Sequence, residues 1–240
     1  MSNSIVKTFH DNAGDYEQEL FAPESPKRVI VCSHGNGVRR WDGQRFFYAV
    51  AEHYSDVAVY TVDQNQAVDD GVALNSIHIM AVRIQKTIER AHIDYPDLEI
   101  VLIGHSMGCS VITYLDLKDV SKVVFISAAA GDPFAGIAER YGAGVKNGTD
   151  VKTSDGRPKI ITKEYIDSIQ NVNREDQYRE MLQRFEEVYA FESGDEEIVG
   201  VDRFKHREMP FKSYKIIPKA LHNFVGPPLI DLLSKIDKII

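Results

Sequence analysis

The chain has 240 residues, of which 43% are hydrophobic and 27% charged, the balance expected of a globular protein with one large domain. This composition argues against a disordered chain, a collagen-like repeat and a disulfide scaffold. The 36 acidic and 28 basic side chains give a net charge of −8 without a basic stripe, which disfavours nucleic acid as a partner.

The sequence contains no segment typical of export or membrane insertion. The first residues lack a basic region followed by an apolar one, and no apolar run approaches the roughly 18 residues of a membrane helix. We therefore expect a cytoplasmic protein without an integral membrane segment. Cys32 and Cys109 lie in apolar segments without metal-ligand spacing, so both are expected to be buried, reduced thiols.

Two alternating segments near the start, Ile5–Phe9 and Tyr16–Phe21, predict an antiparallel hairpin at a sheet edge. Later strand candidates are short, β-branched and almost continuously apolar, a pattern typical of parallel strands that are covered on both faces. They are Arg28–Ser33, Val57–Val62, Leu98–Ile103 and Lys122–Ser127, followed near the end by Val188–Glu192 and Lys212–Ile217.

Helical periodicity separates these strand candidates. The helical segments are Gln44–Tyr54, Val72–Ala91, Ser106–Leu117 and a closing helix, Pro228–Lys238. Strands and helices that alternate in this way require right-handed crossovers and predict a mostly parallel, doubly wound α/β sheet. We expect residues 1–240 to form a single domain.

The segment from Asp132 to about Glu187 interrupts the alternation. It begins with glycine and proline, is more charged than the rest of the chain and is poor in strand-like runs. Two polar helices are predicted within it, at Lys163–Gln170 and Arg174–Glu187, the second capped by Asn173. Such an insertion is typical of a small helical lid over the sheet, although a surface segment without a role in binding has the same pattern.

The strongest chemical signal is Gly104-His105-Ser106-Met107-Gly108. The motif follows a buried strand and opens a helix, as a nucleophile elbow does. Its glycines relieve crowding where the strand meets the helix, so the serine adopts a strained backbone and presents its hydroxyl above the sheet. The helix N-terminus behind Ser106 favours negative charge that develops there.

Two further motifs accompany the elbow: His34-Gly35-Asn36-Gly37 after the first central strand, and Ala220-Leu221-His222-Asn223-Phe224 before the closing helix. With these three motifs the chain resembles the α/β-hydrolase family over most of its length, and only loosely in the predicted lid. In that family, the loop after the first central strand and the residue after the nucleophile supply the amides of the oxyanion hole. The resemblance therefore implies that the backbone N–H groups of Asn36 and Met107 hold an oxyanion.

The resemblance also implies that His222 is the catalytic base. A serine hydroxyl is a weak nucleophile at neutral pH unless a neutral imidazole accepts its proton. His222 lies where the family places this base, between the last strand and the closing helix. His34 and His105 lie in the other two motifs and are expected to shape the site. The other histidines lie in a charged loop or in segments expected to face elsewhere: His10, His53, His78, His92 and His206.

The family order of serine, acid and histidine places the catalytic acid in the acidic loop after residue 192. We predict Asp195, although the loop departs from the family pattern of glycine, two residues and then the acid: the spacing is too short or the glycine is displaced. The apolar pair that follows this loop favours Glu196 instead, and Asp132 and Asp202 are outside candidates. The acid would hold the histidine tautomer and stabilise the imidazolium.

Together these residues predict a serine hydrolase that cleaves a small-molecule carboxylic ester through an acyl-enzyme on Ser106, with no metal and no organic cofactor. No phosphate-cradling glycine loop follows a strand. Two alternatives are a non-catalytic binding module with the same fold, and an acyltransferase or thioesterase with the same triad. Four residues of the insertion either line an acyl pocket or only pack the insertion on the core: Tyr141, Tyr165, Ile166 and Ile169.

Overall fold

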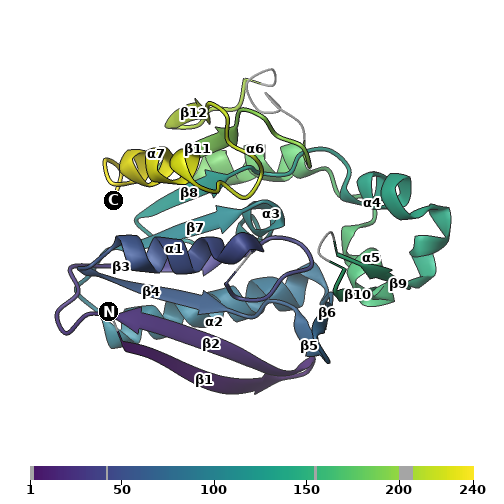
Figure 1. Ribbon diagram of the computed structural model, residues 1–240, viewed down its shortest axis with the longest axis horizontal. Coiled ribbons are helices and arrows are strands. Elements are labelled where there is room, and N and C mark those ends of the chain that lie inside the picture. Colours follow the sequence, from purple (N-terminus) through teal and green to yellow (C-terminus); the bar gives the residue numbers. More distant parts are fainter. Residues whose placement is uncertain (1–2, 42, 154–155, 200–207) are drawn as a thin grey trace.

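The computed structural model describes residues 3–41, 43–153, 156–199 and 208–240, and its centre is an eight-stranded sheet (Figure 1). The strands are β1 (Asn3–Asp11), β2 (Gly14–Ala22), β3 (Arg28–Ser33), β4 (Val57–Val62), β7 (Ile100–His105), β8 (Lys122–Ile126), β11 (Val188–Ser193) and β12 (Ser213–Ile217). Their order in the sheet is β1-β2-β4-β3-β7-β8-β11-β12. The β1–β2 hairpin joins β4 in antiparallel fashion, and all later neighbours are parallel.

Helices cover both faces of this sheet. One apolar core contains residues of α1 (Phe46–His53) and α7 (Pro227–Ile236), and the other contains residues of α2 (Ile77–Asp94) and α3 (Met107–Ile112). Every residue of β4 and β7 is buried, as strands between two helical layers require. The arrangement confirms the predicted doubly wound α/β fold with an N-terminal hairpin. Within the described ranges, no helix has the length and apolar character needed to cross a membrane.

The sheet register brings two of the sequence motifs together. Ser33 at the end of β3 is paired with Gly104 near the end of β7. The two strands are parallel, so the segments that leave them emerge side by side at the carboxyl edge of the sheet, where open α/β folds bind ligands. The His34–Gly37 loop therefore lies next to Ser106.

The predicted strands are correct to within two residues at every end, but two helix boundaries are wrong: α3 ends at Ile112 rather than at Leu117, and the start of α2 also differs. α2 begins at Ile77 rather than at Val72, with the Ser76 hydroxyl accepting a hydrogen bond from the Ile79 N–H. The residues before it pair as strands in a second sheet, and this tertiary pairing overrides their helical periodicity.

That second sheet lies beside the carboxyl edge of the first, and the insertion, which is expected from the sequence to be poor in strands, contributes two short strands to it (Figure 1, right). Its strands, in spatial order, are β5 (Gln66–Val68), β6 (Gly71–Ala73), β10 (Pro158–Ile161) and β9 (Thr149–Lys152). The helices of the insertion are α4 (Pro133–Tyr141), a 3₁₀ helix (Ala143–Asn147), α5 (Lys163–Ile169) and α6 (Arg174–Arg184). The β9–β10 hairpin is thus attached to the main body through β6.

The attachment depends on a close approach at Gly71, where a Cβ atom would lie 2.0 Å from the Pro158 carbonyl oxygen. We expect Gly71→Ala to separate β6 from β10, to lower the free energy of unfolding by about 1–3 kcal/mol and to speed amide exchange across residues 149–161. Urea denaturation and hydrogen exchange measure both effects. Gly136→Ala is the matched control, because Gly136 lies in α4 with open space around it and alanine favours a helix by up to about 1 kcal/mol. Unchanged exchange over the hairpin in Gly71→Ala would contradict this account.

Candidate active site

Ser106 stands at the turn between β7 and α3 with φ 53° and ψ −121°, a backbone conformation that is strained for a residue with a side chain. Its N–H donates to the Ile126 carbonyl of β8 at 2.9 Å, which fixes the turn to the sheet. Its hydroxyl makes no capping hydrogen bond to α3. Ser106 is therefore held in the geometry of a nucleophile elbow, and its hydroxyl is not used as a helix cap.

The two glycines of the motif are required by packing. A Cβ on Gly108 would lie 2.0 Å from the Ser33 carbonyl oxygen, and one on Gly104 would lie 2.7 Å from Ile112 Cδ1. The Ser33 hydroxyl also donates to the Gly108 carbonyl at 3.0 Å. The first turn of α3 is thus pressed against the end of β3, which positions Ser106 relative to the loop that follows β3.

His222 lies in the loop between β12 and α7 and is paired with Glu196. Its Nδ1 lies 2.9 and 3.0 Å from the two carboxylate oxygens of Glu196. A carboxylate only accepts hydrogen bonds, so Nδ1 carries a proton, and in the neutral tautomer of this imidazole Nε2 has the lone pair. The His222 N–H also donates to Glu197 Oε2 at 2.9 Å, and its carbonyl lies 2.8 Å from His105 Nε2.

The Glu196 side chain is fully buried. Burial alone would raise its pKa, but hydrogen bonds from His222, from the Ser193 hydroxyl and from the Val199 N–H outweigh this and hold the pKa at about 2. The carboxylate is ionised at neutral pH and stabilises a proton on the imidazole beside it.

The prediction of Asp195 as the partner of His222 is wrong. Asp195 is exposed, and its N–H donates to the Ala220 carbonyl at 2.9 Å. Gly194 packs against the end of β12, where a Cβ would lie 2.9 Å from the Ile217 carbonyl oxygen. In the turn that follows, the side chain that reaches His222 is that of Glu196. Of the outside candidates, Asp132 caps α4 by accepting from the Ala135 N–H at 3.0 Å, and Asp202 lies outside the described residues, as does His206.

His105 links the serine and the histidine. It directly precedes Ser106, its ring centroid lies 4.8 Å from that of His222, and its Nε2 contacts the His222 carbonyl. Among the described residues, the Ser106 hydroxyl has no hydrogen bond to His222. A serine–histidine contact in an unliganded site is often long and shortens in the reacting complex.

The two expected oxyanion-hole residues lie on either side of one tyrosine. Tyr165 of α5 is completely buried; its hydroxyl accepts from Asn36 Nδ2 at 3.2 Å and lies 3.4 Å from Met107 Sδ. Met107 is the first residue of α3, where a backbone N–H has no acceptor within the helix. Tyr165 thus connects the insertion to the loop after β3 and to the start of α3. Ile166 and Ile169 are buried in the same core as Tyr165, as the packing interpretation expects.

The loop after β3 is fixed by hydrogen bonds to the residues after β4, and one of them defines the state of His34. The Gln64 N–H donates to His34 Nε2 at 3.0 Å, so this nitrogen is unprotonated and Nδ1–H donates to the Gly35 carbonyl at 2.9 Å. Gln64 Oε1 accepts from the His34 N–H at 3.0 Å. His34 is therefore a neutral, structural imidazole.

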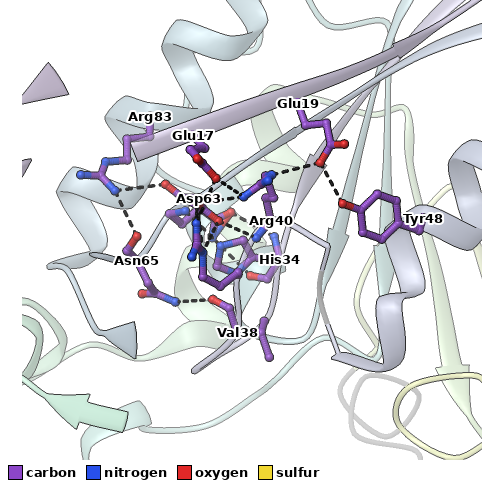
Figure 2. A network of polar contacts seen from close by, with 11 residues as sticks. Glu17, Glu19, His34, Val38, Arg40, Tyr48, Asp63, Asn65 and Arg83 are labelled. Carbon is purple, nitrogen blue, oxygen red and sulfur yellow. Dashed lines mark hydrogen bonds and ion pairs between the residues drawn. The ribbon is translucent and has the colours of Figure 1, made fainter. Parts of the chain in front are cut away.

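A buried ionic network fixes the same loop a few residues further on (Figure 2). Arg40 binds Glu17 at 2.6 Å and Glu19 at 3.1 Å on β2, and its N–H donates to Asp63 Oδ1 at 2.8 Å. Tyr48 of α1 donates to Glu19 at 2.9 Å. Each buried charge has a partner of opposite sign, as low-dielectric surroundings require. The network ties the N-terminal hairpin and β4 to the loop that carries Asn36.

Other features of the described residues lie outside this chemistry. Cys32 and Cys109 are buried and form no disulfide with each other, as predicted. No group of three or more histidine, cysteine and acidic side chains in the described ranges is placed to hold a metal ion. Two surface hollows, of about 400 and 360 Å³, share Tyr114 and contain none of the three residues Ser106, His222 and Glu196.

The model of a family described as "Alpha/beta hydrolase family" matches residues 30–210, which include the elbow and Glu196. The chain belongs to the alpha/beta hydrolase family. This membership agrees with the strand order and with the strained serine at the turn after β7.

Several solved structures share the fold over nearly the whole chain. An esterase domain from Rhodothermus marinus is 17% identical, with 98% of this chain and 97% of that chain covered and a TM-score of 0.67. Est1E from Butyrivibrio proteoclasticus is 15% identical over 97% and 96%, with a TM-score of 0.69. A thermostable carboxyl esterase from Bacillus coagulans is 12% identical over 100% and 99%, with a TM-score of 0.70. A search of curated proteins found no match.

The lowered pKa of Glu196 predicts how the stability of the fold depends on pH. The folded-state pKa of about 2 lies below the ordinary value of 4.5, so ionised Glu196 stabilises the fold above about pH 4.5, and this contribution is lost as the pH falls toward 2. We expect Glu196→Gln to be less stable than the wild type at pH 7, by on the order of 1–3 kcal/mol, and the difference to shrink below pH 4.5. Urea denaturation at a series of pH values measures it, with the exposed Asp195→Asn as control. A difference that is constant from pH 7 to 3 would contradict the assignment.

Proposed function

We propose that this alpha/beta hydrolase is a serine esterase that cleaves a small-molecule carboxylic ester through an acyl-enzyme on Ser106. One observation carries the proposal: the strained Ser106 directly follows His105, whose ring centroid lies 4.8 Å from that of His222, and Nδ1 of His222 is bound by the buried, ionised Glu196. This arrangement leaves Nε2 of His222 as the base for the serine proton.

In the first half of the reaction, Ser106 Oγ attacks the ester carbonyl while His222 Nε2 accepts its proton. Glu196 stabilises the resulting imidazolium through Nδ1 and does not itself take up the proton. The N–H groups of Asn36 and Met107 donate to the oxyanion, and the N-terminus of α3 adds a favourable electrostatic field. When the tetrahedral intermediate collapses, His222 returns the proton to the departing alcohol.

In the second half, water replaces the alcohol. His222 removes a proton from this water, the hydroxide oxygen attacks the acyl carbon, and the same N–H groups bind the second oxyanion. Collapse breaks the bond to Oγ, returns the proton to Ser106 and releases a carboxylic acid. An acceptor other than water would make the enzyme an acyltransferase, and product analysis with added alcohols or thiols distinguishes the two.

The ester class is supported by relatives of the same fold, since the structures from Rhodothermus marinus and Bacillus coagulans are described as an esterase domain and a carboxyl esterase. Fold alone does not establish turnover, because a binding module can share the architecture. A fully buried, ionised Glu196 directed at His222 favours an enzyme, because a module that only binds a ligand has no need of an oriented base.

Labelling with a fluorophosphonate tests the nucleophile. We expect the probe to modify the wild type at Ser106, and Ser106→Ala to lose both the label and at least about 10⁴-fold in hydrolysis of p-nitrophenyl esters, as removal of a serine nucleophile does. Mass spectrometry locates the label, and Ser110→Ala, whose hydroxyl lies 2.9 Å from that of Tyr178 in the core, serves as a nearby control. Equal labelling of wild type and Ser106→Ala would favour the binding module.

A pair of neighbouring substitutions tests the acid. Glu196→Gln keeps the shape of the side chain but removes its charge, so we expect kcat to fall by about 10³–10⁴-fold, as loss of a triad acid does. Asp195→Asn should change kcat by less than about threefold, because Asp195 is exposed and meets the site only through its backbone. Comparable losses in the two variants, or a larger loss in Asp195→Asn, would reject Glu196.

A further inference from the structure

A lysine of the insertion lies against the loop expected to form the oxyanion hole. Lys159 is on β10 and is 8% exposed, although lysine is rarely buried without a partner. A Cβ on Gly37 would lie 2.8 Å from Lys159 Cδ and 3.2 Å from Nζ, and Gly37 has φ +73°. The lysine amine is therefore next to the residue that follows Asn36.

Within the described part of the chain, no carboxylate pairs with Lys159. Its Nζ lies 5.5 Å from the ring centroid of Tyr141, and the guanidinium of Arg140 lies 5.6 Å from the same ring. Burial and the charge of Arg140 lower the pKa of the Lys159 amine to about 8. Two cations thus lie near one ring, and the more buried of them, Lys159, has no anion beside it among the described residues.

Comparison with Arg40 indicates that Lys159 lacks an anionic partner among the described residues. Arg40 is as buried as Lys159, but two glutamates and Asp63 neutralise it. A buried ammonium beside a second cation is destabilising for the protein alone, and an anion that enters with a ligand would remove that penalty. A buried amine in such a place marks a candidate binding group.

We propose that Lys159, assisted by Arg140, binds a carboxylate carried by the substrate, so that the enzyme acts on esters with an anionic group close to the scissile bond. This inference names the substrate class of the proposed esterase site and rests on that function. The position of Lys159 beside Gly37 places the anion next to the oxyanion loop. The β6–β10 pairing holds the lysine there, since Lys159 is in register with Val72.

Two pairs of esters of matched size test the proposal. In the first, mono-p-nitrophenyl glutarate has a carboxylate where p-nitrophenyl pentanoate has a methyl group; in the second, 4-acetoxybenzoate is compared with 4-methylphenyl acetate. We expect the wild type to prefer the anionic member of at least one pair by about tenfold or more in kcat/KM, the usual value of a charged hydrogen bond. Lys159→Met, which keeps the apolar stem, should lose this preference through a rise in KM.

Lys152→Met is the matched control, because Lys152 is an exposed residue of the same hairpin, and it should keep the wild-type preference. Arg140→Met removes an exposed cation without disturbing the core, so a weakened preference there supports the proposal even where Lys159→Met is poorly folded. Equal kcat/KM for the charged and neutral esters in both pairs, or a preference that persists in folded Lys159→Met, would overturn it.

Calorimetric titration of Ser106→Ala with monomethyl glutarate separates this inference from the proposed function. Binding that is lost in Ser106→Ala/Lys159→Met supports the anion site even if no ester is hydrolysed, in which case only the esterase proposal fails. Two outcomes would reject the anion site: binding of monomethyl glutarate that is equally strong with and without Lys159, or no binding together with no preference for the anionic ester in hydrolysis. In either case the fluorophosphonate label still tests the esterase proposal.

Discussion

The close approach of α3 to the end of β3 is the constraint on which the rest of the structure depends. At Gly108 there is no room even for a methyl group, because the Ser33 carbonyl oxygen occupies that position. Ser106 can leave β7 for α3 only through a sharp turn, and it does so at positive φ. The same contact brings the first N–H groups of α3 beside the loop after β3, so one packing contact positions both the proposed nucleophile and the N–H groups expected to bind an oxyanion.

Buried polar groups fix the loop after β3, which lies against the start of α3. The loop after β3 has little apolar surface with which to anchor itself, and it is fixed instead by Gln64, by the neutral His34 and by Arg40 with its three carboxylates. Polar contacts are directional, so they define the position of a loop more narrowly than apolar packing does. The N-terminal hairpin supplies Glu17 and Glu19 to this network, which links an edge of the sheet to the geometry of the loop that carries Asn36.

Much of the fold could be predicted from the sequence because its signals are local. Buried strands, an amphipathic helix and the glycines around Ser106 each follow from residues close together in the chain. The acid could not be fixed in this way, since the choice between Asp195 and Glu196 depends on how Gly194 packs against β12, a contact between segments far apart in sequence. The second sheet escaped prediction for the same reason: β6 has three residues and acquires its partner, β10, from the insertion.

The buried charged side chains of the described residues differ in whether the chain itself supplies their partners. Arg40 and Arg83 are buried with partners of opposite charge, the buried Glu196 accepts a hydrogen bond from His222, and these interactions are complete within the chain. Lys159 is buried to a similar extent near a cation, an arrangement that costs stability and has no compensating ion pair within the described ranges. Natural proteins keep such unfavourable groups chiefly where function requires them, because substitution by an apolar residue would otherwise stabilise the fold. The insertion is therefore more than a cover for the core, since it carries the one buried charge in the described ranges whose interactions a substrate anion would complete.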